Sequence, residues 1–169
     1  MKKITAFVGS ASKKNTYRAV LQFLNNVQAL GEIEYEIVIL NNYKLGICRG
    51  CCLCFKKGEE FCPLKDDRDL LMAKIEASDG VIFASPNYTW QMSGSMKVFL
   101  DRFGFACHRP RYFGKVFTSI VTQGFRGGNK IVDYFDFLAQ TLGFNTVKGT
   151  CVTMCIPCQR RMSRRLTRL

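Results

Sequence analysis

Cysteines are the residues of this chain whose type and spacing most directly suggest chemistry. Five of its nine cysteines lie in the segment GICRGCCLCFKKGEEFC, residues 46–62. Four of these have the spacing C-x2-C-x2-C-x7-C, namely Cys48, Cys51, Cys54 and Cys62. Thiolates this close together on one loop can bind a metal or take part in redox reactions, and oxidised thiols can form disulfides. Small buried thiols without chemistry are the remaining interpretation.

The expected compartment bears on the choice between these roles. The N-terminal sequence MKKITAFVGSASKK has two lysines and then an apolar run that stops at Gly9 and Ser10, too early for the core of a signal peptide. No stretch approaches the roughly 20 apolar residues that cross a bilayer. We therefore expect a cytoplasmic protein without a membrane partner, in which thiols stay reduced and permanent disulfides are disfavoured.

A second group of candidate residues lies in the segment GSASKKNT, residues 9–16, where small residues lead directly into an expected helix. Backbone N–H groups and the helix dipole favour an anion at a helix N-terminus. The side chains that can add donors or positive charge are Ser10, Ser12, Lys13, Lys14, Asn15 and Thr16. The pattern is neither GxGxxG nor GxxxxGKS/T, which disfavours a Rossmann dinucleotide site and a P-loop. Ordinary helix capping by Ser or Asn is the alternative.

Two further segments suit a flat polar ring. In SPNYTW, residues 85–90, Pro86 stiffens the turn, and Tyr88 and Trp90 can flank an aromatic system. TQG, residues 122–124, offers backbone donors to the polar edge of a heterocycle. The alternatives are aromatic side chains that merely cover the edge of the core and a plain glycine turn. A phosphate site together with an aromatic, amide-rich surface fits flavin mononucleotide (FMN).

These segments need a scaffold that brings them together, and the apolar pattern predicts one. Short apolar runs bounded by turn residues predict five strands, at residues 4–9, 34–40, 80–85, 115–123 and 146–154. Apolar residues at helical spacing predict helices at residues 15–30, 66–78, 93–106 and 129–144. Because parallel neighbours need crossover helices, the alternation predicts an α/β fold with a doubly wound parallel sheet between two helix layers. Ligands bind such sheets beyond the carboxyl ends of the strands, where the three segments are expected.

The segments VGSASKKNT, CRGCCLCFKKGEEFCPLKDD, SPNYTWQMSGSMKVFLDR and TQGFRGG together resemble the flavodoxin-like NADPH-dependent FMN reductase family. The resemblance covers residues 4–153 and is greatest to the cysteine-rich branch that includes the iron–sulfur flavoproteins. It implies a three-layer flavodoxin-like fold with strand order 2-1-3-4-5. It also implies an FMN-binding domain at residues 1–155 with a cysteine-rich loop at residues 46–65, and assembly into a homodimer or homotetramer.

The resemblance also assigns residues to two cofactors. The expected FMN contacts are Ser10, Ser12, Lys13, Asn15, Thr16, Pro86, Asn87, Tyr88, Trp90, Thr122, Gln123 and Gly124. In iron–sulfur flavoproteins the compact cysteine pattern binds a [4Fe–4S] cluster, for which the expected ligands are Cys48, Cys51, Cys54 and Cys62. A structural zinc fits less well, because its ligand pairs usually lie further apart. A loop that keeps the pattern without a cluster stays an alternative.

The implied activity is that of an FMN-dependent oxidoreductase. It passes electrons from NAD(P)H through FMN to a quinone, another flavin, a nitro or azo compound, or an iron–sulfur cluster. One alternative is a flavodoxin-like electron carrier without NAD(P)H turnover, which the net charge of +12 disfavours because flavodoxins are usually acidic. The other is a basic nucleic-acid-binding module, which is disfavoured because the aromatic residues lie in apolar runs.

Positive charge is concentrated late in the chain. Residues 1–100 carry 13 Lys and Arg against 10 Asp and Glu, whereas residues 101–169 carry 12 against 3. A basic surface favours anionic partners such as phosphorylated cofactors. Residues 156–169 form an expected basic tail in place of the helix that usually follows the fifth strand in the family. One face of the sheet is therefore expected to be thinly covered, or covered by a partner chain.

Overall fold

Strands and helices alternate along the chain as the apolar pattern predicts. The computed structural model describes residues 1–154. In this part of the chain, strands lie at Lys2–Val8 (β1), Ile33–Ile39 (β2), Gly80–Pro86 (β3), Val116–Gln123 (β4), Asn145–Thr146 (β5) and Thr150–Thr153 (β6). The α-helices lie at Asn15–Gln28 (α1), Leu53–Lys56 (α2), Arg68–Glu76 (α3), Gly94–Asp101 (α4), Gly104–His108 (α5) and Asn129–Thr141 (α6), and 3-10 turns at Leu40–Asn42 (η1) and Glu59–Phe61 (η2).

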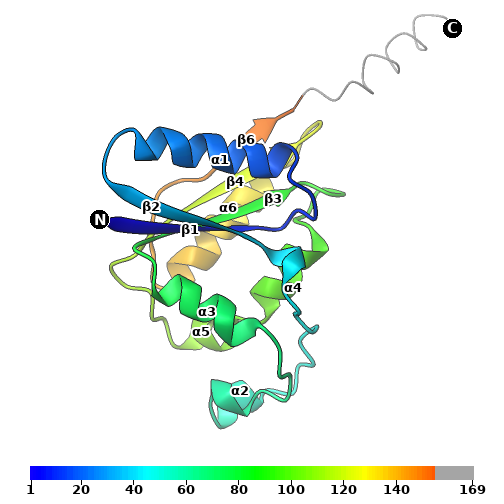
Figure 1. The fold of residues 1–169 in the computed structure, drawn as a ribbon. Helices are drawn as coiled ribbons and strands as arrows, with labels where there is room; N and C mark the ends of the chain where they lie inside the picture. Colours follow the sequence, from blue (N-terminus) through cyan, green and yellow to red (C-terminus); the bar gives the residue numbers. More distant parts are fainter. Residues whose placement is uncertain (155–169) are drawn as a thin grey trace, which may run out of the picture.

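The strands form one parallel sheet in the order β2-β1-β3-β4-β5, with β6 paired to β4 further along (Figure 1). This confirms the predicted flavodoxin-like order. Since neighbouring strands run in the same direction, β1, β3 and β4 end at one edge of the sheet. The register shows this directly, because Val8 pairs with Ala84 and Pro86 pairs with Thr122.

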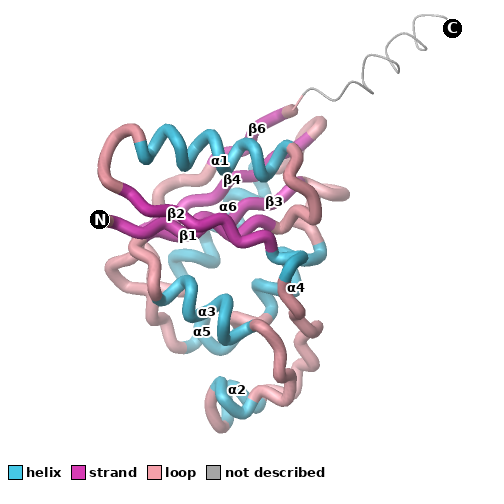
Figure 2. Tube along the Cα trace, in the orientation of Figure 1, coloured by secondary structure: helices cyan, strands magenta, loops and turns pink. Residues whose placement is uncertain are grey.

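Alternate side chains of the central strands build two apolar layers, as expected for a parallel sheet that is buried on both faces. Phe7, Phe83 and Phe117 are fully buried on the face covered by α3, α4, α5 and α6. The ring of Phe83 meets those of Phe7 and Phe117 edge-on, with centroids 6.0 and 5.0 Å apart. On the other face, the strands pack against Val20 and Leu24 of α1 (Figure 2).

The helix predicted at residues 93–106 is divided into α4 and α5. It begins as expected, because Ser93 Oγ accepts a hydrogen bond from the N–H of Met96 and so caps α4. The chain then turns at Arg102, whose N–H donates to the carbonyl of Phe99 at 3.2 Å, an i–3 bond that tightens the last turn. The side chain of Arg102 is buried in contacts with a distant segment, which the local apolar pattern did not reveal.

The strand predicted at residues 146–154 is divided into β5 and β6. β5 pairs Val116 with Asn145, an offset of 29 residues, whereas β6 pairs Ile120 with Thr150, an offset of 30. One extra residue is therefore accommodated between the two pieces, as in a β-bulge. Gly149 lies in this interval, and a Cβ on it would lie 2.0 Å from Ser119 Oγ. The backbone thus passes β4 too closely for any residue with a side chain.

Within residues 1–154, α1 is the one helix on its face of the sheet (Figure 2). Beside it an apolar groove of about 320 Å³ stays open over β3 and β4, lined in part by Phe23 and Val27 of α1. Val116 and Val147 in this groove are 47% and 59% exposed. The thin cover expected on one sheet face is therefore present in the described residues, and the basic tail at 156–169 lies outside them.

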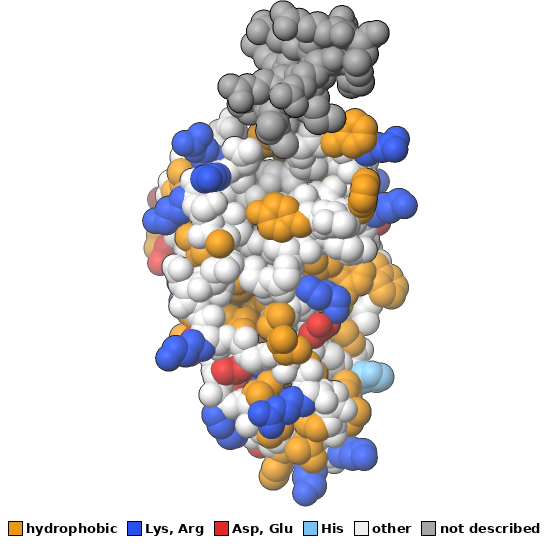
Figure 3. Space-filling view, turned by 90° about the vertical axis from the view of Figure 1, so that its right-hand side faces the viewer, with side chains coloured by type: hydrophobic (Ala, Val, Ile, Leu, Met, Phe, Trp, Pro, Cys, Tyr) orange, Lys and Arg blue, Asp and Glu red, His pale blue; other side chains and the backbone are white. Residues whose placement is uncertain are grey.

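The side of the molecule at which β1, β3 and β4 end is mostly neutral, with separate Lys and Arg side chains spread mainly around its margin and fewer Asp and Glu (Figure 3). This agrees with the net charge of +12. Anionic ligands are attracted to such a surface. None of the helices in the described part of the chain combines the length and the apolar character needed to cross a bilayer.

Candidate functional site

The three loops singled out in the sequence meet at the carboxyl edge of the sheet. The N–H of Gly9, after β1, donates to the carbonyl of Ala84 in β3 at 2.8 Å. The N–H of Asn87, after β3, donates to the carbonyl of Thr122 in β4 at 2.7 Å. The hydroxyls of Thr16 and Thr122 are buried and 2.7 Å apart, so α1 and β4 are joined as well. Segments more than a hundred residues apart thus form one surface.

Between these loops lies a cavity of about 310 Å³, here called the strand-end pocket. Its lining consists of Ser10, Ser12, Lys14, Asn15, Thr16, Pro86, Asn87, Tyr88, Thr122, Gln123, Gly124 and Met154. Ten of the twelve residues expected to contact FMN are among them, and the two that are not are Lys13 and Trp90. Lys14 and Met154 line the pocket without having been among the expected contacts.

The side of the pocket formed by the β1–α1 loop suits an anion. α1 begins at Asn15, and its N-cap residue Lys14 makes no side-chain capping hydrogen bond. Ser10 Oγ donates instead to the carbonyl of Ser12 at 3.0 Å, within the loop. The first N–H groups of a helix have no partner inside the helix, and no acidic residue lies in the first turn of α1. The simple capping interpretation of this segment therefore does not describe it.

The side of the pocket formed by the β3–α4 loop contains a buried acceptor without a partner. Asn87 Nδ2 donates to the carbonyl of Arg126 at 3.1 Å. Asn87 Oδ1 is buried and has no hydrogen-bond partner within residues 1–154. A buried polar atom of this kind costs free energy unless something pairs with it, so Asn87 is suited to a ligand that carries an N–H or O–H donor.

The β4–α6 loop is held in shape by the side chain of Gln123. Its Oε1 accepts a hydrogen bond from the N–H of Gly128 at 2.7 Å, and its Nε2 donates to Thr153 Oγ1 at 3.0 Å. The amide of Gln123 is therefore occupied by the protein itself. A ligand on this side of the pocket would meet the backbone of the loop, which is the interpretation that the TQG segment suggested.

Trp90 and Lys13, the two expected FMN contacts outside the pocket lining, contact other parts of the protein. Thr89 and Trp90 both have positive φ angles, 51° and 61°, in a tight turn that pairs Tyr88 with Gln91. This turn places the Trp90 indole against Gly127, where a Cβ would lie 2.5 Å from Trp90 Cδ1. Trp90 therefore packs the β3–α4 loop onto the β4–α6 loop. Lys13 Nζ lies 5.5 Å from the centre of the Tyr17 ring, outside the pocket.

The cysteine loop, residues 46–65, leaves the sheet after β2 and lies beyond α3 and α5, with α2 at its far end (Figure 1). It is more ordered than the long loop expected, since it contains α2 and η2. Cys48, Cys51, Cys52, Cys54 and Cys62 line a cavity of about 70 Å³, here called the thiol cavity. Arg49, Arg68 and Arg102 also line it, as does the acid Asp101.

Cys54 is the cysteine of the spaced motif whose surroundings change its ionisation. Burial raises the pKa of the Cys54 thiol, and charge on the three other cysteines of the motif raises it further. All the described cysteines are free thiols, whereas Cys155 and Cys158 lie outside the described residues. In residues 1–154, no three side chains of His, Cys, Asp or Glu are grouped closely enough to hold a single metal ion. The motif therefore surrounds a cavity rather than a mononuclear metal position.

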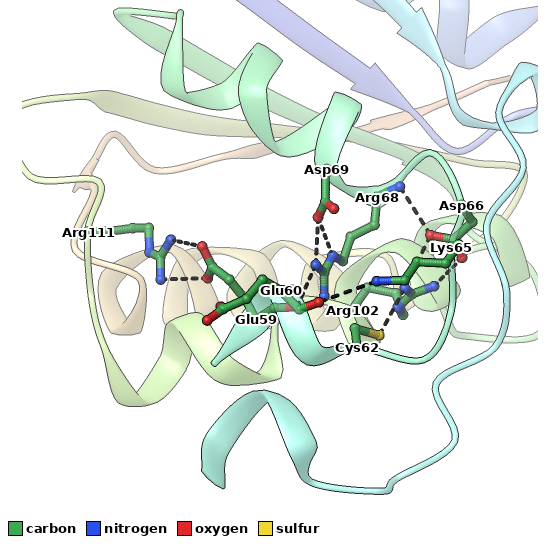
Figure 4. A network of polar contacts seen from close by, with 9 residues as sticks. All are labelled: Glu59, Glu60, Cys62, Lys65, Asp66, Arg68, Asp69, Arg102 and Arg111. Carbon is green, nitrogen blue, oxygen red and sulfur yellow. Dashed lines mark hydrogen bonds and ion pairs between the residues drawn. The ribbon is translucent and has the colours of Figure 1, made fainter. Parts of the chain in front are cut away.

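A buried ion pair closes the base of the cysteine loop (Figure 4). Arg102 Nη1 lies 2.5 Å from Asp66 Oδ2, and Arg102 Nη2 lies 3.2 Å from Asp66 Oδ1. The N–H of Gly46 donates to Asp66 Oδ2 at 2.8 Å, so both ends of the loop meet at this pair. Burial opposes ionisation of Asp66, yet hydrogen bonds from Arg102 and two backbone N–H groups hold its pKa below the usual value.

Comparisons with known proteins agree with this geometry. Residues 2–155 match the family model described as NADPH-dependent FMN reductase. An iron–sulfur flavoprotein of Archaeoglobus fulgidus is 31% identical over 142 residues, which are 83% of this chain and 69% of that protein. A second one from the same organism is 41% identical over 113 residues, 67% of this chain but only 48% of that protein. The chain thus spans about half the length of some of the relatives it matches.

Solved structures support the fold. The structure of RosB with bound 8-demethyl-8-formylriboflavin-5'-phosphate aligns with a TM-score of 0.74 and 12% sequence identity. The alignment covers 98% of this chain and 72% of that one. At this identity the likeness establishes the shared flavodoxin-like architecture and no more.

Proposed function

Because this chain belongs to the NADPH-dependent FMN reductase family, we propose that it is an FMN-dependent oxidoreductase that takes electrons from NAD(P)H. The electrons leave to a small acceptor, such as a quinone, a flavin, or a nitro or azo compound, or to an iron–sulfur cluster on the cysteine loop. The observation that carries the proposal is the convergence of three non-adjacent loops on the strand-end pocket. Ligands of open α/β sheets bind in this position.

The residues of the strand-end pocket fit FMN. Ser10, Ser12, Asn15 and Thr16 surround the start of α1, where a phosphate benefits from backbone N–H groups and from the helix dipole. Asn87 Oδ1 has no partner among residues 1–154, and the ring system and ribityl chain of FMN carry donors that could pair with it. Pro86 and Tyr88 would provide an apolar wall for the ring, and the backbone of residues 122–124 would offer donors to its polar edge.

Bound FMN supplies a ring that accepts hydride from NAD(P)H and releases electrons to an acceptor. The protein residues bind, orient and shield that ring. The Thr16–Thr122 hydrogen bond and the packing of Trp90 on Gly127 fix the loops relative to one another. Tyr88 and Trp90 are each 59% exposed beside the pocket, which leaves room for a planar nicotinamide or acceptor to approach. None of the lining side chains is required to transfer a proton.

The thiol cavity suits a [4Fe–4S] cluster held by Cys48, Cys51, Cys54 and Cys62. Four thiolates around one cavity are the donor set of such a cluster, and three arginines in its lining would offset the negative charge. A structural zinc fits less well, because zinc ligand pairs usually lie further apart in the sequence than in this compact motif. Relatives named iron–sulfur flavoproteins support the same choice.

The proposal is tested on protein purified without oxygen. We expect bound FMN by absorbance and by chromatography of the released flavin, together with iron and acid-labile sulfide near four of each per chain, the content of one such cluster. NADPH oxidation with an added quinone distinguishes a reductase from an electron carrier. If titrated FMN leaves the fluorescence of the protein and of the flavin unchanged, the FMN proposal is wrong. If iron and sulfide stay absent after reconstitution, the cluster proposal is wrong.

A further inference from the structure

We propose that Arg102 is a positioning residue for the cysteine loop, which holds the Cys62 sulfur at the wall of the thiol cavity and places positive charge against it. Arg102 follows directly after α4, and α4 is packed into the core through Met96 and Phe99. Cys62 lies forty residues earlier in the chain, near the return of the loop to α3. The contact therefore joins the loop to a fixed element of the scaffold.

The guanidinium of Arg102 contacts Gly46 and Cys62 of the loop and Asp66 just beyond it. Figure 4 shows the contacts with Asp66 and Cys62. Nη1 donates to the carbonyl of Gly46 at 2.9 Å and to Asp66 Oδ2 at 2.5 Å. Nη2 donates to Asp66 Oδ1 at 3.2 Å and to Cys62 Sγ at 3.5 Å. The Arg102 side chain is only 2% exposed, so water hardly competes for these contacts.

The other arginines near the loop bind oxygen atoms. Arg68 donates to the carbonyl of Glu59 at 2.9 Å and to the carboxylate of Asp69 at 2.7 Å. Arg111 pairs with the carboxylate of Glu59 at 2.8 Å, with its side chain 28% exposed. Among residues 1–154, Arg102 is the arginine that donates to a cysteine of the motif. Arg111 is therefore a matched control, because it is tied to the same loop but touches no sulfur.

The contact has two expected consequences for Cys62. The hydrogen bond keeps the sulfur at the wall of the thiol cavity, so it limits access of alkylating reagents to this thiol. If the cluster of the proposed function is bound, hydrogen bonds and positive charge at a ligand sulfur also favour its reduced form. An arginine can serve Asp66 and Cys62 together because its donors form a planar fork, which the single ammonium of a lysine cannot reproduce.

The first experiment needs no cluster. The full-length chain, purified without added iron, is treated with iodoacetamide, and alkylation of each cysteine is followed by peptide mass spectrometry. We expect Arg102→Gln to speed alkylation of Cys62 roughly tenfold, because loss of one charge-assisted hydrogen bond lets the sulfur leave the cavity wall that much more often, while Cys48 and Cys51 keep their rates. Arg102→Lys, which keeps a partner for Asp66, should show the same selective gain in Cys62 alkylation if Arg102→Gln does not fold. Arg111→Gln should leave all rates unchanged.

The second experiment uses the protein with its reconstituted cluster. We expect Arg102→Lys to lower the midpoint potential by about 59 mV, a tenfold change in a one-electron equilibrium, with Arg111→Gln at the wild-type value. A folded Arg102 variant with an unchanged rate of Cys62 alkylation overturns the proposal. An equal effect of Arg111→Gln also overturns it, because Arg102 would then only support the loop in general. A wild-type protein that binds no iron refutes the cluster alone, because the alkylation result stands without it.

Discussion

The strand-end pocket and the thiol cavity both collect residues that are distant in the sequence, but different forces hold them. The pocket is built on the ends of β1, β3 and β4, whose relative positions are fixed by the parallel register of the sheet. The thiol cavity lies on the cysteine loop, residues 46–65, which is part of the segment between β2 and α3 and lies outside the sheet. The base of this loop is held by the buried ion pair between Arg102 and Asp66. Arg68 and Arg111 hold the loop further along, at Glu59.

This difference predicts how each site responds to damage. A site on strand ends shares the stability of the core, whereas a site on an excursion depends on the few contacts at its base. Loss of the Arg102–Asp66 pair should therefore disturb the cysteine loop and leave the strand-end pocket formed. Changes at the pocket should alter flavin binding while the cysteine loop stays in place.

The largest expected effect follows from Asp66→Ala. This change leaves the buried guanidinium of Arg102 without its carboxylate, and breaking a buried pair in this way costs about 3–5 kcal/mol of unfolding free energy. Urea denaturation measures the loss. Glu59→Ala is the control, because it removes a partly exposed pair with Arg111 and should cost less than about 1 kcal/mol. FMN affinity of the folded Asp66→Ala protein should equal that of the wild type. If Asp66→Ala lowered both the stability and the FMN affinity of the folded protein, the two sites would not be independent.

The next effect concerns the hydroxyl pair inside the pocket. Thr122→Val leaves the buried Thr16 hydroxyl without its partner at 2.7 Å and should cost about 1–3 kcal/mol of stability. Replacing both residues by Val should recover most of that loss, because no unpaired hydroxyl remains. FMN affinity should stay reduced in the double variant, since Thr16 and Thr122 line the pocket. Thermal unfolding and fluorescence titration separate the two results, and full recovery of affinity would count against a role in FMN binding.

A smaller effect is expected where the two outer loops meet. Gly127 has a φ of 94°, and a Cβ on it would lie 2.5 Å from Trp90 Cδ1. Gly127→Ala should cost about 1–2 kcal/mol, since the backbone conformation is strained for any other residue. Adding Trp90→Ala removes the clash but leaves that strain, so only part of the stability should return. Unchanged stability in Gly127→Ala, measured by urea denaturation, would mean that the loops do not pack in this way.

The same contrast explains what the sequence could predict. The pocket was predictable because strand ends follow from apolar periodicity, and parallel strands must end at one edge. The packing of Trp90 against Gly127 could not be predicted, because its direction depends on two consecutive positive φ angles, which neither Thr89 nor Trp90 signals by type. The sequence also did not predict the break between α4 and α5 or the ion pair between Arg102 and Asp66, for a related reason. Arg102 and Asp66 are thirty-six residues apart, and nothing in their spacing indicates contact.

Lys13 and Lys14 give the finest comparison within the pocket, because neighbouring residues of the same type point to different surroundings. Lys14 lines the pocket at the start of α1, whereas Lys13 lies against Tyr17. Lys14→Ala should weaken FMN binding by about 0.3–1 kcal/mol, the usual size of an exposed charge near a helix end. Lys13→Ala should leave the dissociation constant unchanged, and the Lys14 effect should shrink at high salt, because exposed charges are screened. Riboflavin, which lacks the phosphate, should bind both variants alike. A larger effect of Lys13→Ala on FMN affinity would place the phosphate on the outer side of the loop. Ser10 and Ser12, which line the pocket, would then not be phosphate contacts.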